Sequence, residues 1–292
     1  MQTIQQRTTN NLRRSETISR PVAILMLVLT SILWSTSGIL IKLISWNPVA
    51  ISGFRSGIAA LLIFLVVRKP KFTWSFYQVG AAVAYVLTVV SFVLANKLTT
   101  SANAILLQYS APIYVAIFGH IFLKERTKII DWITIFFVVG GMVLFFIDEL
   151  SVDNMVGNIV AVLSGVFFAA LTLFMRMQKD GSPLESILIG NIATAIIGLP
   201  FMITSEKPDL TGWIMLILLG VFQLGLSYIL YSYAIKYVTA LEAIIITVIE
   251  PVLNPVWVYI FTGEVPGKWA LVGGIIVLIS ITVRSVISEV TS

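Results

Sequence analysis

The chain has 292 residues, of which 58% are hydrophobic and 11% are charged, and its mean hydropathy is +0.98. A typical soluble domain is about 45–50% apolar and about 25% charged. With 19 basic and 14 acidic side chains, the chain has too few charges to cover a water-facing surface. The composition therefore excludes a soluble globular enzyme and a disordered chain, and the lack of cysteine excludes a disulfide framework. We predict an integral membrane protein.

Ten apolar stretches are each long enough to cross a bilayer as a helix, since about 20 apolar residues span about 30 Å of hydrocarbon. These stretches are apolar on every side, without the alternation that marks barrel strands. The predicted fold is an all-α integral membrane protein with ten transmembrane helices. The helices are expected at residues 21–44, 48–67, 76–96, 101–123, 129–147, 157–175, 184–203, 213–235, 240–261 and 269–287.

The distribution of basic residues predicts the orientation of these spans. Loops on the cytoplasmic side of membrane proteins carry an excess of Lys and Arg. If the N-terminal tail is cytoplasmic, 14 of the 19 basic residues fall on that side, 4 fall on the other, and Arg55 lies within a span. We therefore predict a multi-pass protein of the inner or plasma membrane with both termini in the cytoplasm. The net charge of +5 then needs no nucleic-acid partner.

The two halves of the chain resemble each other at an offset of 139 residues. The offset brings Lys97 onto Lys236, Thr100 onto Thr239 and Pro112 onto Pro251. Each half holds five predicted spans, and because five is odd, the second copy must lie inverted in the membrane. We predict a cytoplasmic basic tail at 1–20, a first five-helix repeat at 21–150 and an inverted second repeat at 151–292 that ends in a short cytoplasmic C-terminus. Chance similarity between apolar helices is the alternative to a repeat.

Several local motifs accompany this repeat. The first half contains Leu33-Trp34-Ser35, Pro48 with Arg55, Pro112, Glu125 and Gly140-Gly141, and the second half contains Glu250-Pro251, Gly263-Glu264 and Gly273-Gly274. With these motifs the chain resembles the drug/metabolite transporter superfamily, of the EamA type with ten helices, over about residues 21–287. The resemblance implies a five-plus-five helix arrangement whose first, third, fourth, sixth, eighth and ninth helices wall a cavity. It also implies transport of amino acids or other metabolites, while relatives in the superfamily move sugars, nucleotide sugars, choline or toxic cations.

Glu250 is the first candidate for a functional residue, because an ionisable side chain deep in a membrane span is costly and is usually functional. Thr247, Glu250 and Asn254 are spaced to form one polar stripe on the predicted ninth helix. Pro251 and Pro255 are expected to interrupt this helix and to free backbone carbonyls beside the carboxylate. These groups suit a proton or a substrate amino group. A structural carboxylate held by a neighbouring Arg or Tyr is the alternative.

Arg55 is the second candidate and lies within the predicted second helix. Gly53 and Gly57 flank it in a pattern that favours close helix contact. Arg55 is expected to hold a substrate carboxylate or to pair with Glu250. The structural alternatives are that it fixes its helix by binding backbone carbonyls or that it reaches the outer membrane interface. The sole histidine, His120, is expected at the membrane interface, where a proton-shuttle role is less expected than a structural one.

Polar and aromatic side chains at mid-helix depth complete the candidate site. They could contact substrate, stack on a ring or surround an ammonium group, although such residues also bond helices together. Pro112, like Pro251 and Pro255, is expected in a helix that moves as a gate. The candidate contacts are Trp34, Tyr85, Gln108, Tyr109, Gln223 and Tyr228.

The sequence also indicates which chemistry is not expected. There is no Walker A motif, no HExxH motif, no cysteine and one histidine, so we expect no ATP coupling, no metal, no cofactor and no enzymatic activity. We hypothesise a secondary active transporter that works by alternating access, with a small-molecule substrate, the lipid bilayer and protons as its partners. Export of amino acids or related compounds is favoured. Transport of organic cations is the close alternative, and a non-transporting structural or assembly protein is the alternative from another class. The oligomeric state is left open.

Overall fold

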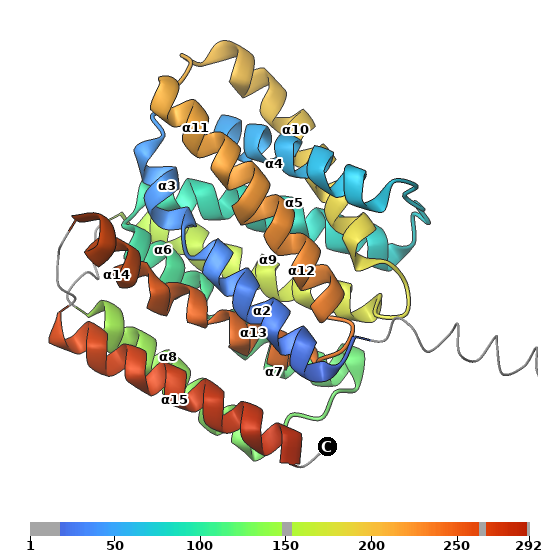
Figure 1. The fold of residues 1–292 in the computed structure, drawn as a ribbon, viewed down its shortest axis with the longest axis vertical. Coiled ribbons are helices and arrows are strands. Elements are labelled where there is room, and N and C mark those ends of the chain that lie inside the picture. The colour runs from blue at the N-terminus through green and yellow to red at the C-terminus, as the bar shows by residue number, and fades with distance from the viewer. Residues whose placement is uncertain (1–17, 148–153, 263–266, 291–292) are drawn as a thin grey trace, which may run out of the picture.

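The computed structural model describes residues 18–147, 154–262 and 267–290, except for the side chains of residues 254, 255, 258, 259, 261, 262 and 288–290. All regular structure in this part of the chain is helical (Figure 1). In chain order, the helices are α2 (Arg20–Trp34), α3 (Ser37–Leu43), α4 (Pro48–Val67), α5 (Phe76–Leu98), α6 (Ser101–Gln108), α7 (Ala111–Leu123), α8 (Ile129–Phe146), α9 (Met155–Met177), α10 (Pro183–Thr204), α11 (Leu210–Leu218), the π-helix η1 (Leu219–Leu226), α12 (Ser227–Ala234), α13 (Ala240–Thr247), α14 (Ile249–Thr262) and α15 (Lys268–Val290).

Nine helical segments in the described residues are long and apolar enough to cross a membrane. They correspond to nine of the ten predicted spans, and they make the chain a multi-pass membrane protein. The remaining predicted span, 240–261, is formed by two shorter helices, α13 and α14, which are separated at Val248.

Four of the predicted spans are interrupted rather than continuous. α2 gives way to α3 at Ser35, α6 to α7 at Tyr109, and α13 to α14 at Val248, while η1 widens the helix between α11 and α12. α6 and α13 begin in the same way, because the side chains of Thr100 and Thr239 each accept a hydrogen bond from a backbone N–H in the first turn. Adding 139 to the bounds of α6 gives the bounds of α13, so these two breaks match the offset found in the sequence.

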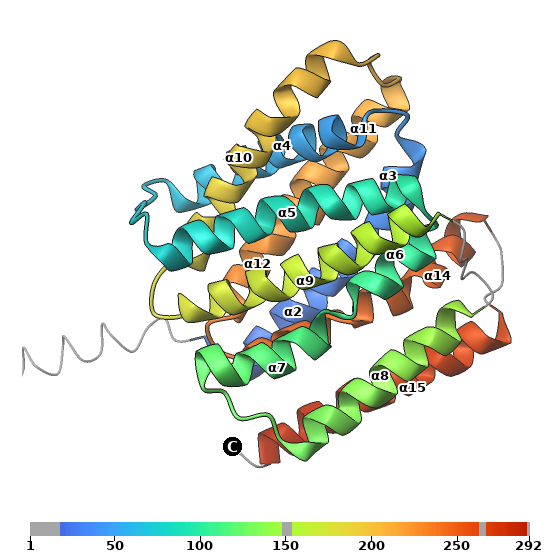
Figure 2. The ribbon, with the colours of Figure 1, turned by 180° about the vertical axis from the view of Figure 1, so that it is seen from behind.

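The helices pack in pairs that join the two halves of the chain. α4 lies along α10, α5 along α9, α2 along α12, and α8 along α15. Figures 1 and 2 show from opposite sides that α8 and α15 form one edge of the molecule, while α4, α10 and α11 lie at the other. The middle of the bundle therefore lies between α2, α5, α9, α12 and α13.

The pairing of α8 with α15 depends on glycine at the contact. A Cβ added at Gly273 would meet the carbonyl oxygen of Gly141 and, at 2.5 Å, the backbone nitrogen of Phe145. A Cβ added at Gly140 would meet nothing within 4 Å. Gly141 and Gly273 therefore allow two backbones to approach closely, as small residues do in membrane helix pairs.

The distribution of polarity is the reverse of that in a soluble protein. Large apolar side chains cover the outside, including Phe76 at 76% exposure, Ile203 at 74% and Phe136 at 73%. Polar and charged side chains such as Arg55 and Glu250 are buried inside. This arrangement suits a hydrocarbon solvent, in which polar groups must find their partners within the protein.

Candidate functional site

A small cavity of about 40 Å³ lies in the middle of the bundle. Its wall combines the two membrane-embedded charges singled out in the sequence with aromatic and amide side chains. The lining residues are Trp34, Arg55, Thr88, Val89, Phe92, Gln108, Phe168, Gln223, Leu224, Tyr228 and Glu250. The cavity thus receives residues from α2, α4, α5, α6, α9, η1, α12 and α14. This volume is enough for about three water molecules, because a water needs about 10–15 Å³ of such space.

Glu250 lies in the first turn of α14 and is 5% exposed. The hydroxyl of Tyr109 donates a hydrogen bond to Oε2 of Glu250 at 2.6 Å and also lies 2.8 Å from the carbonyl oxygen of Thr247. Tyr109 stands at the break between α6 and α7, and Glu250 follows the break between α13 and α14. The contact therefore joins the two broken helices, one from each half of the chain.

The polar stripe predicted on a single ninth helix is wrong in one respect. Thr247 ends α13, whereas Glu250 belongs to α14, and the hydroxyl of Thr247 binds the carbonyl of Ile244 at 2.9 Å. The break precedes Pro251 because proline is accommodated in the first turn of a helix, where its missing N–H has no intrahelical partner. Pro112 likewise lies in the first turn of its helix, as the second residue of α7.

Two other candidates on this segment, Asn254 and Pro255, have side chains that lie outside the described residues.

Arg55 is 1% exposed and also lines the cavity, from α4. Its Nη1 donates to Oε1 of Gln223 at 2.9 Å. Its Nε has no hydrogen-bond partner in the described part of the chain, and no carboxylate there forms an ion pair with it. The alternative that Arg55 pairs with Glu250 is therefore not observed, and a buried cation is left with one neutral acceptor at the cavity.

Gln223 reaches Arg55 from the π-helix η1. A π-helix is rare and occurs often at functional sites, because the wider turn alters where its side chains point. A Cβ added at Gly220, in the same segment, would lie 2.9 Å from the backbone oxygen of Arg55. The segment is therefore packed closely against the backbone of α4 at Arg55.

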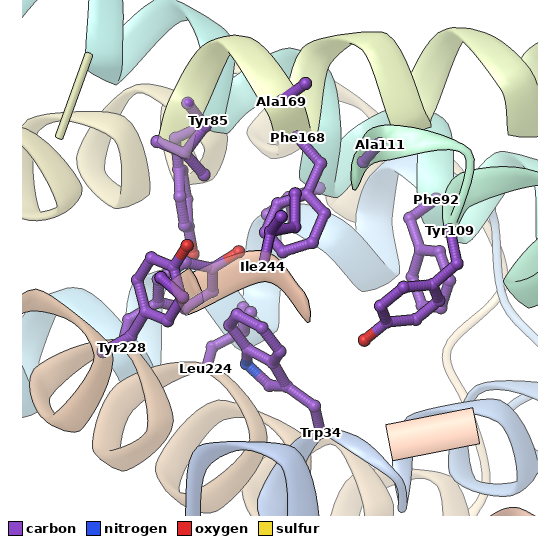
Figure 3. Packing of buried hydrophobic residues seen from close by; sticks show 14 of the residues in the cluster. Trp34, Tyr85, Phe92, Tyr109, Ala111, Phe168, Ala169, Leu224, Tyr228 and Ile244 are labelled. Atoms are coloured by element: carbon purple, nitrogen blue, oxygen red, sulfur yellow. The ribbon is translucent and has the colours of Figure 1, made fainter. Parts of the chain in front are cut away.

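Aromatic side chains also form part of the cavity wall, and Figure 3 shows Trp34, Phe168 and Tyr228 close together. The ring of Trp34 lies 5.1 Å from Tyr228, 5.4 Å from Tyr231 and 5.6 Å from Phe168, measured between centroids. The indole Nε1 of Trp34 donates to the hydroxyl of Ser227 at 2.8 Å, which fixes the ring. Such a wall can stack on a flat group or surround a cation.

The two remaining candidates, Gln108 and Tyr85, form hydrogen bonds that link neighbouring helices. Gln108 lines the cavity and donates through Nε2 to the hydroxyl of Ser164 at 2.8 Å, which links α6 to α9. Tyr85 does not line the cavity, and its hydroxyl donates to Oδ1 of Asn191 at 2.8 Å, while its ring contacts Tyr228 at 4.9 Å. Tyr85 therefore supports the wall from behind.

Comparison with known proteins identifies the family. The model of the EamA-like transporter family matches residues 21–147 and again residues 155–286, once in each half. The chain belongs to the EamA-like transporter family. The similarity that the sequence motifs carry to the drug/metabolite transporters is thereby confirmed, whereas the substrate is not specified by the family.

Named relatives of this EamA protein are transporters. It is 27% identical over 270 residues to the pseudopaline exporter CntI of Pseudomonas aeruginosa, covering 88% of this chain and 93% of the relative. It is 26% identical over 262 residues to an uncharacterized transporter of Archaeoglobus fulgidus, covering 88% and 94%, and 26% identical over 285 residues to solute carrier family 35 member G1 of Mus musculus, covering 87% and 76%. A solved crystal structure with 17% identity superposes with a TM-score of 0.78 over 92% of this chain and 99% of the other, which supports the fold.

Hydrogen bonds hold the EamA bundle together at both ends of the cavity. At the end where α2 begins, Arg176 binds Oε1 of Glu125 at 2.8 Å, and Arg20 binds Glu242 at 2.6 Å. Oε2 of Glu125 also accepts from the backbone N–H of Ala240, the first residue of α13. These contacts join α7, α9, α2 and α13 at that end.

At the opposite end, two lysines cross over between α3 and the turn that follows α5. Lys42 donates to the carbonyl of Thr99 at 2.9 Å, and Lys97 donates to the carbonyl of Ile44 at 2.7 Å. Each end of the bundle is thus held by a few hydrogen bonds or ion pairs between helices.

Sequence reasoning missed several residues of the cavity wall. Val89, Phe92, Phe168 and Leu224 line it but stand among apolar neighbours on apolar helices, so no local pattern marks them. A buried ion pair between Asp131 of α8 and Arg284 of α15, at 2.9 Å, was also not predicted. The available signal was the presence of opposite charges in two of the predicted spans, 129–147 and 269–287.

Proposed function

We propose that this EamA protein is a secondary active transporter that exports amino acids or related zwitterionic metabolites by alternating access. The observation that carries the proposal is that Arg55 and Glu250 line the same cavity while making no ion pair with each other in the described residues. A substrate carboxylate would bind Arg55, whose Nε lacks a partner, and a substrate amino group would displace the hydroxyl of Tyr109 from Glu250. Each buried charge would then gain the opposite charge that it lacks.

The broken helices supply the movement that this mechanism needs. Ligand cavities that take up small molecules measure about 300–1,000 Å³, so the central cavity of about 40 Å³ must expand to admit substrate. In our proposal α6–α7 and α13–α14 act as gates that pivot at their breaks, near Pro112 and Pro251. Opening at one end would separate Arg176 from Glu125, and opening at the other would separate Lys42 and Lys97 from their carbonyls.

The proposal includes a topology. We infer ten spans, with α13 and α14 together forming the ninth, and two inverted repeats at 21–150 and 151–292. The matched bounds of α6 and α13, and the two family matches, support this arrangement. The excess of basic residues supports cytoplasmic termini and an inner or plasma membrane location. Glu250 would bind a proton when no amino group is present, which would couple export to proton entry.

Transport of organic cations is the second candidate, favoured by the aromatic wall around Trp34. The two candidates differ in what they require of Arg55. A zwitterion needs this guanidinium for its carboxylate, whereas an organic cation is repelled by it. The uncompensated charge of Arg55 is the reason that we place the zwitterion first.

A counterflow assay in proteoliposomes tests the proposal. Proteoliposomes that contain the purified protein are loaded with an unlabelled amino acid. Uptake of the labelled amino acid is then compared with uptake of the corresponding labelled decarboxylated amine. We expect exchange of one or more amino acids, little exchange of their amines, and loss of exchange in Glu250→Gln and Arg55→Gln. Glu206→Gln and Arg68→Gln are matched controls, because both residues are exposed and lie outside the cavity.

Each other result contradicts the proposal in a distinct way. Exchange of amines that survives in Arg55→Gln would indicate an organic-cation transporter. Absence of exchange for amino acids, amines and sugars, with correctly folded protein, would favour a non-transporting membrane protein. If Glu250→Gln exchanged substrate at the full rate, and this rate depended on the pH gradient as in the unchanged protein, Glu250 would have no part in the mechanism.

A further inference from the structure

A second cavity, of about 310 Å³, lies away from the central one, at the end of the bundle where α2 begins. It is bounded by the end of α7, the turn into α8, the start of α13 and the last turns of α15. The lining residues are Val115, Gly119, His120, Glu125, Arg126, Thr127, Lys128, Ile130, Asp131, Thr239, Leu241, Arg284 and Ile287. None of these residues lines the central cavity, and the proposed transport mechanism does not use this space.

The carboxylates that line this cavity are already bonded within the protein. The two lining carboxylates each have both oxygens engaged: Glu125 by Arg176 and the N–H of Ala240, and Asp131 by Nε of Arg284 and the N–H of Lys128. Arg284 is 5% exposed, and its Nη1 has no hydrogen-bond partner among the described groups. A buried donor of this kind is costly unless a ligand satisfies it.

Two helices also begin at this cavity. α8 starts at Ile129 and α13 starts at Ala240, and Ile130 and Thr239, beside these starts, line the cavity. Side chains of the protein already bond to backbone N–H groups at both starts, Glu125 and Thr239 at α13 and Asp131 at α8, so a further anion would bind to the cations. Arg126 and Lys128 are exposed at the mouth and add two full charges.

We propose that this cavity is a binding site for a phosphate-bearing anion. The neighbouring surface favours a phospholipid headgroup as the source, because Ile287 at the cavity and Ile121, Phe122 and Ile129 beside it are exposed apolar side chains that acyl chains can cover. Basic pockets between membrane helices near the cytoplasmic surface recognise headgroups in this way. A soluble phosphate group would satisfy the same donors, and the experiment separates the two sources.

The test is a thermal-shift titration of the delipidated full-length protein in neutral detergent. The probes are phosphatidylglycerol in mixed micelles, phosphatidylcholine as a zwitterionic lipid of the same chain length, and inorganic phosphate against chloride at equal ionic strength. We expect Tm to rise saturably with phosphatidylglycerol and not with phosphatidylcholine. Arg126→Gln should weaken the apparent affinity about fivefold, as expected for one cation at an anionic surface. Arg68→Gln, the same change at an exposed residue outside the cavity, should leave it unchanged.

Arg284→Gln should abolish the rise in Tm with phosphatidylglycerol. Because this variant leaves Asp131 unpaired and can fail to fold, the test relies on Arg126→Gln. A shift with inorganic phosphate and none with phosphatidylglycerol would support the anion site and assign it to a soluble ligand. The proposal is overturned if neither probe shifts Tm, if phosphatidylcholine shifts it equally, or if Arg126→Gln and Arg68→Gln respond alike. None of these results depends on transport activity.

Discussion

The hydroxyl of Tyr109 donates a hydrogen bond to Oε2 of Glu250 at 2.6 Å, across the line that divides the two halves of the chain. Both residues stand where a helix is interrupted, and both are buried. The bond thus connects the break of α6–α7 to the break of α13–α14. In our account it is the contact that substrate or a proton must replace.

Tyr109→Phe should therefore reduce transport more than it reduces the stability of the fold. Loss of the hydroxyl leaves the carboxylate with one donor fewer, and hydrogen bonds between membrane helices are worth about 0.6–2 kcal/mol. We expect the free energy of unfolding to fall by an amount within that range. The rate of substrate exchange should fall by a larger fraction than the free energy of unfolding does. A double-mutant cycle with Glu250→Gln, read by thermal unfolding and by counterflow, measures the coupling. Additive effects on both readouts would mean that the two side chains act independently.

Arg55→Met should remove transport without reducing stability. A buried cation with no carboxylate partner in the described residues contributes little to the fold, and an apolar side chain of similar length avoids its desolvation cost. We expect an unfolding free energy equal to or above that of the unchanged protein. The measurement is chemical or thermal unfolding of purified protein beside the exchange assay.

Arg284→Met is the matched control for this substitution. Arg284 binds Asp131 at 2.9 Å, so its removal leaves a buried carboxylate unpaired and should cost about 3–5 kcal/mol. If Arg55→Met were destabilised as much as Arg284→Met, the role of Arg55 would be structural.

Gly273→Ala should destabilise the α8–α15 pair, whereas Gly140→Ala should not. An alanine Cβ at residue 273 would lie 2.5 Å from the backbone nitrogen of Phe145, which a rigid helix cannot move aside. At residue 140 the same methyl group meets open space, and alanine is the better helix former by about 0.5–1 kcal/mol. Thermal unfolding of the two variants checks this. Equal effects would contradict the close approach of the two helices.

Glu125→Gln should make the end of the bundle where α2 begins open more readily. The substitution removes the charge that binds Arg176 while keeping an acceptor for the N–H of Ala240. Because the chain has no cysteine, a single cysteine introduced in the cavity can report opening by its rate of reaction with a maleimide. We expect the cysteine to react faster with maleimide added at the end where α2 begins, and at an unchanged rate with maleimide added at the other end. An unchanged rate would mean that the ion pair does not control access, and Glu206→Gln serves as the control.

The spans were predictable from sequence because each needs about 20 apolar residues, and the scarcity of charge made the exceptions visible. Arg55 and Glu250 were found for that reason, and both line the cavity. The helix breaks were predicted less well. Pro112 and Pro251 marked two of them, but the interruption after Trp34 and the π-helix at Gln223 have no proline.

The apolar part of the cavity wall could not be predicted for a related reason. Phe168 and Leu224 line the cavity because α9 and η1 turn these residues inward, and on helices that are apolar all round no periodic pattern distinguishes inside from outside. The partner of Arg55 illustrates the same limit. The sequence left open Glu250, a substrate carboxylate, backbone carbonyls or the outer interface as the partner of Arg55. The structure supplies Gln223, from a segment whose π-helical turn was not predicted.

The most direct test of alternating access uses Val89, which lines the cavity, is 3% exposed and makes no polar contact through its side chain. Val89→Cys is expressed in right-side-out and inside-out vesicles and treated with a membrane-impermeant maleimide. The account predicts labelling from both sides and slower labelling from both in the presence of the transported amino acid. Labelling from one side only, or from neither side with an unfolded control labelled fully, would contradict it.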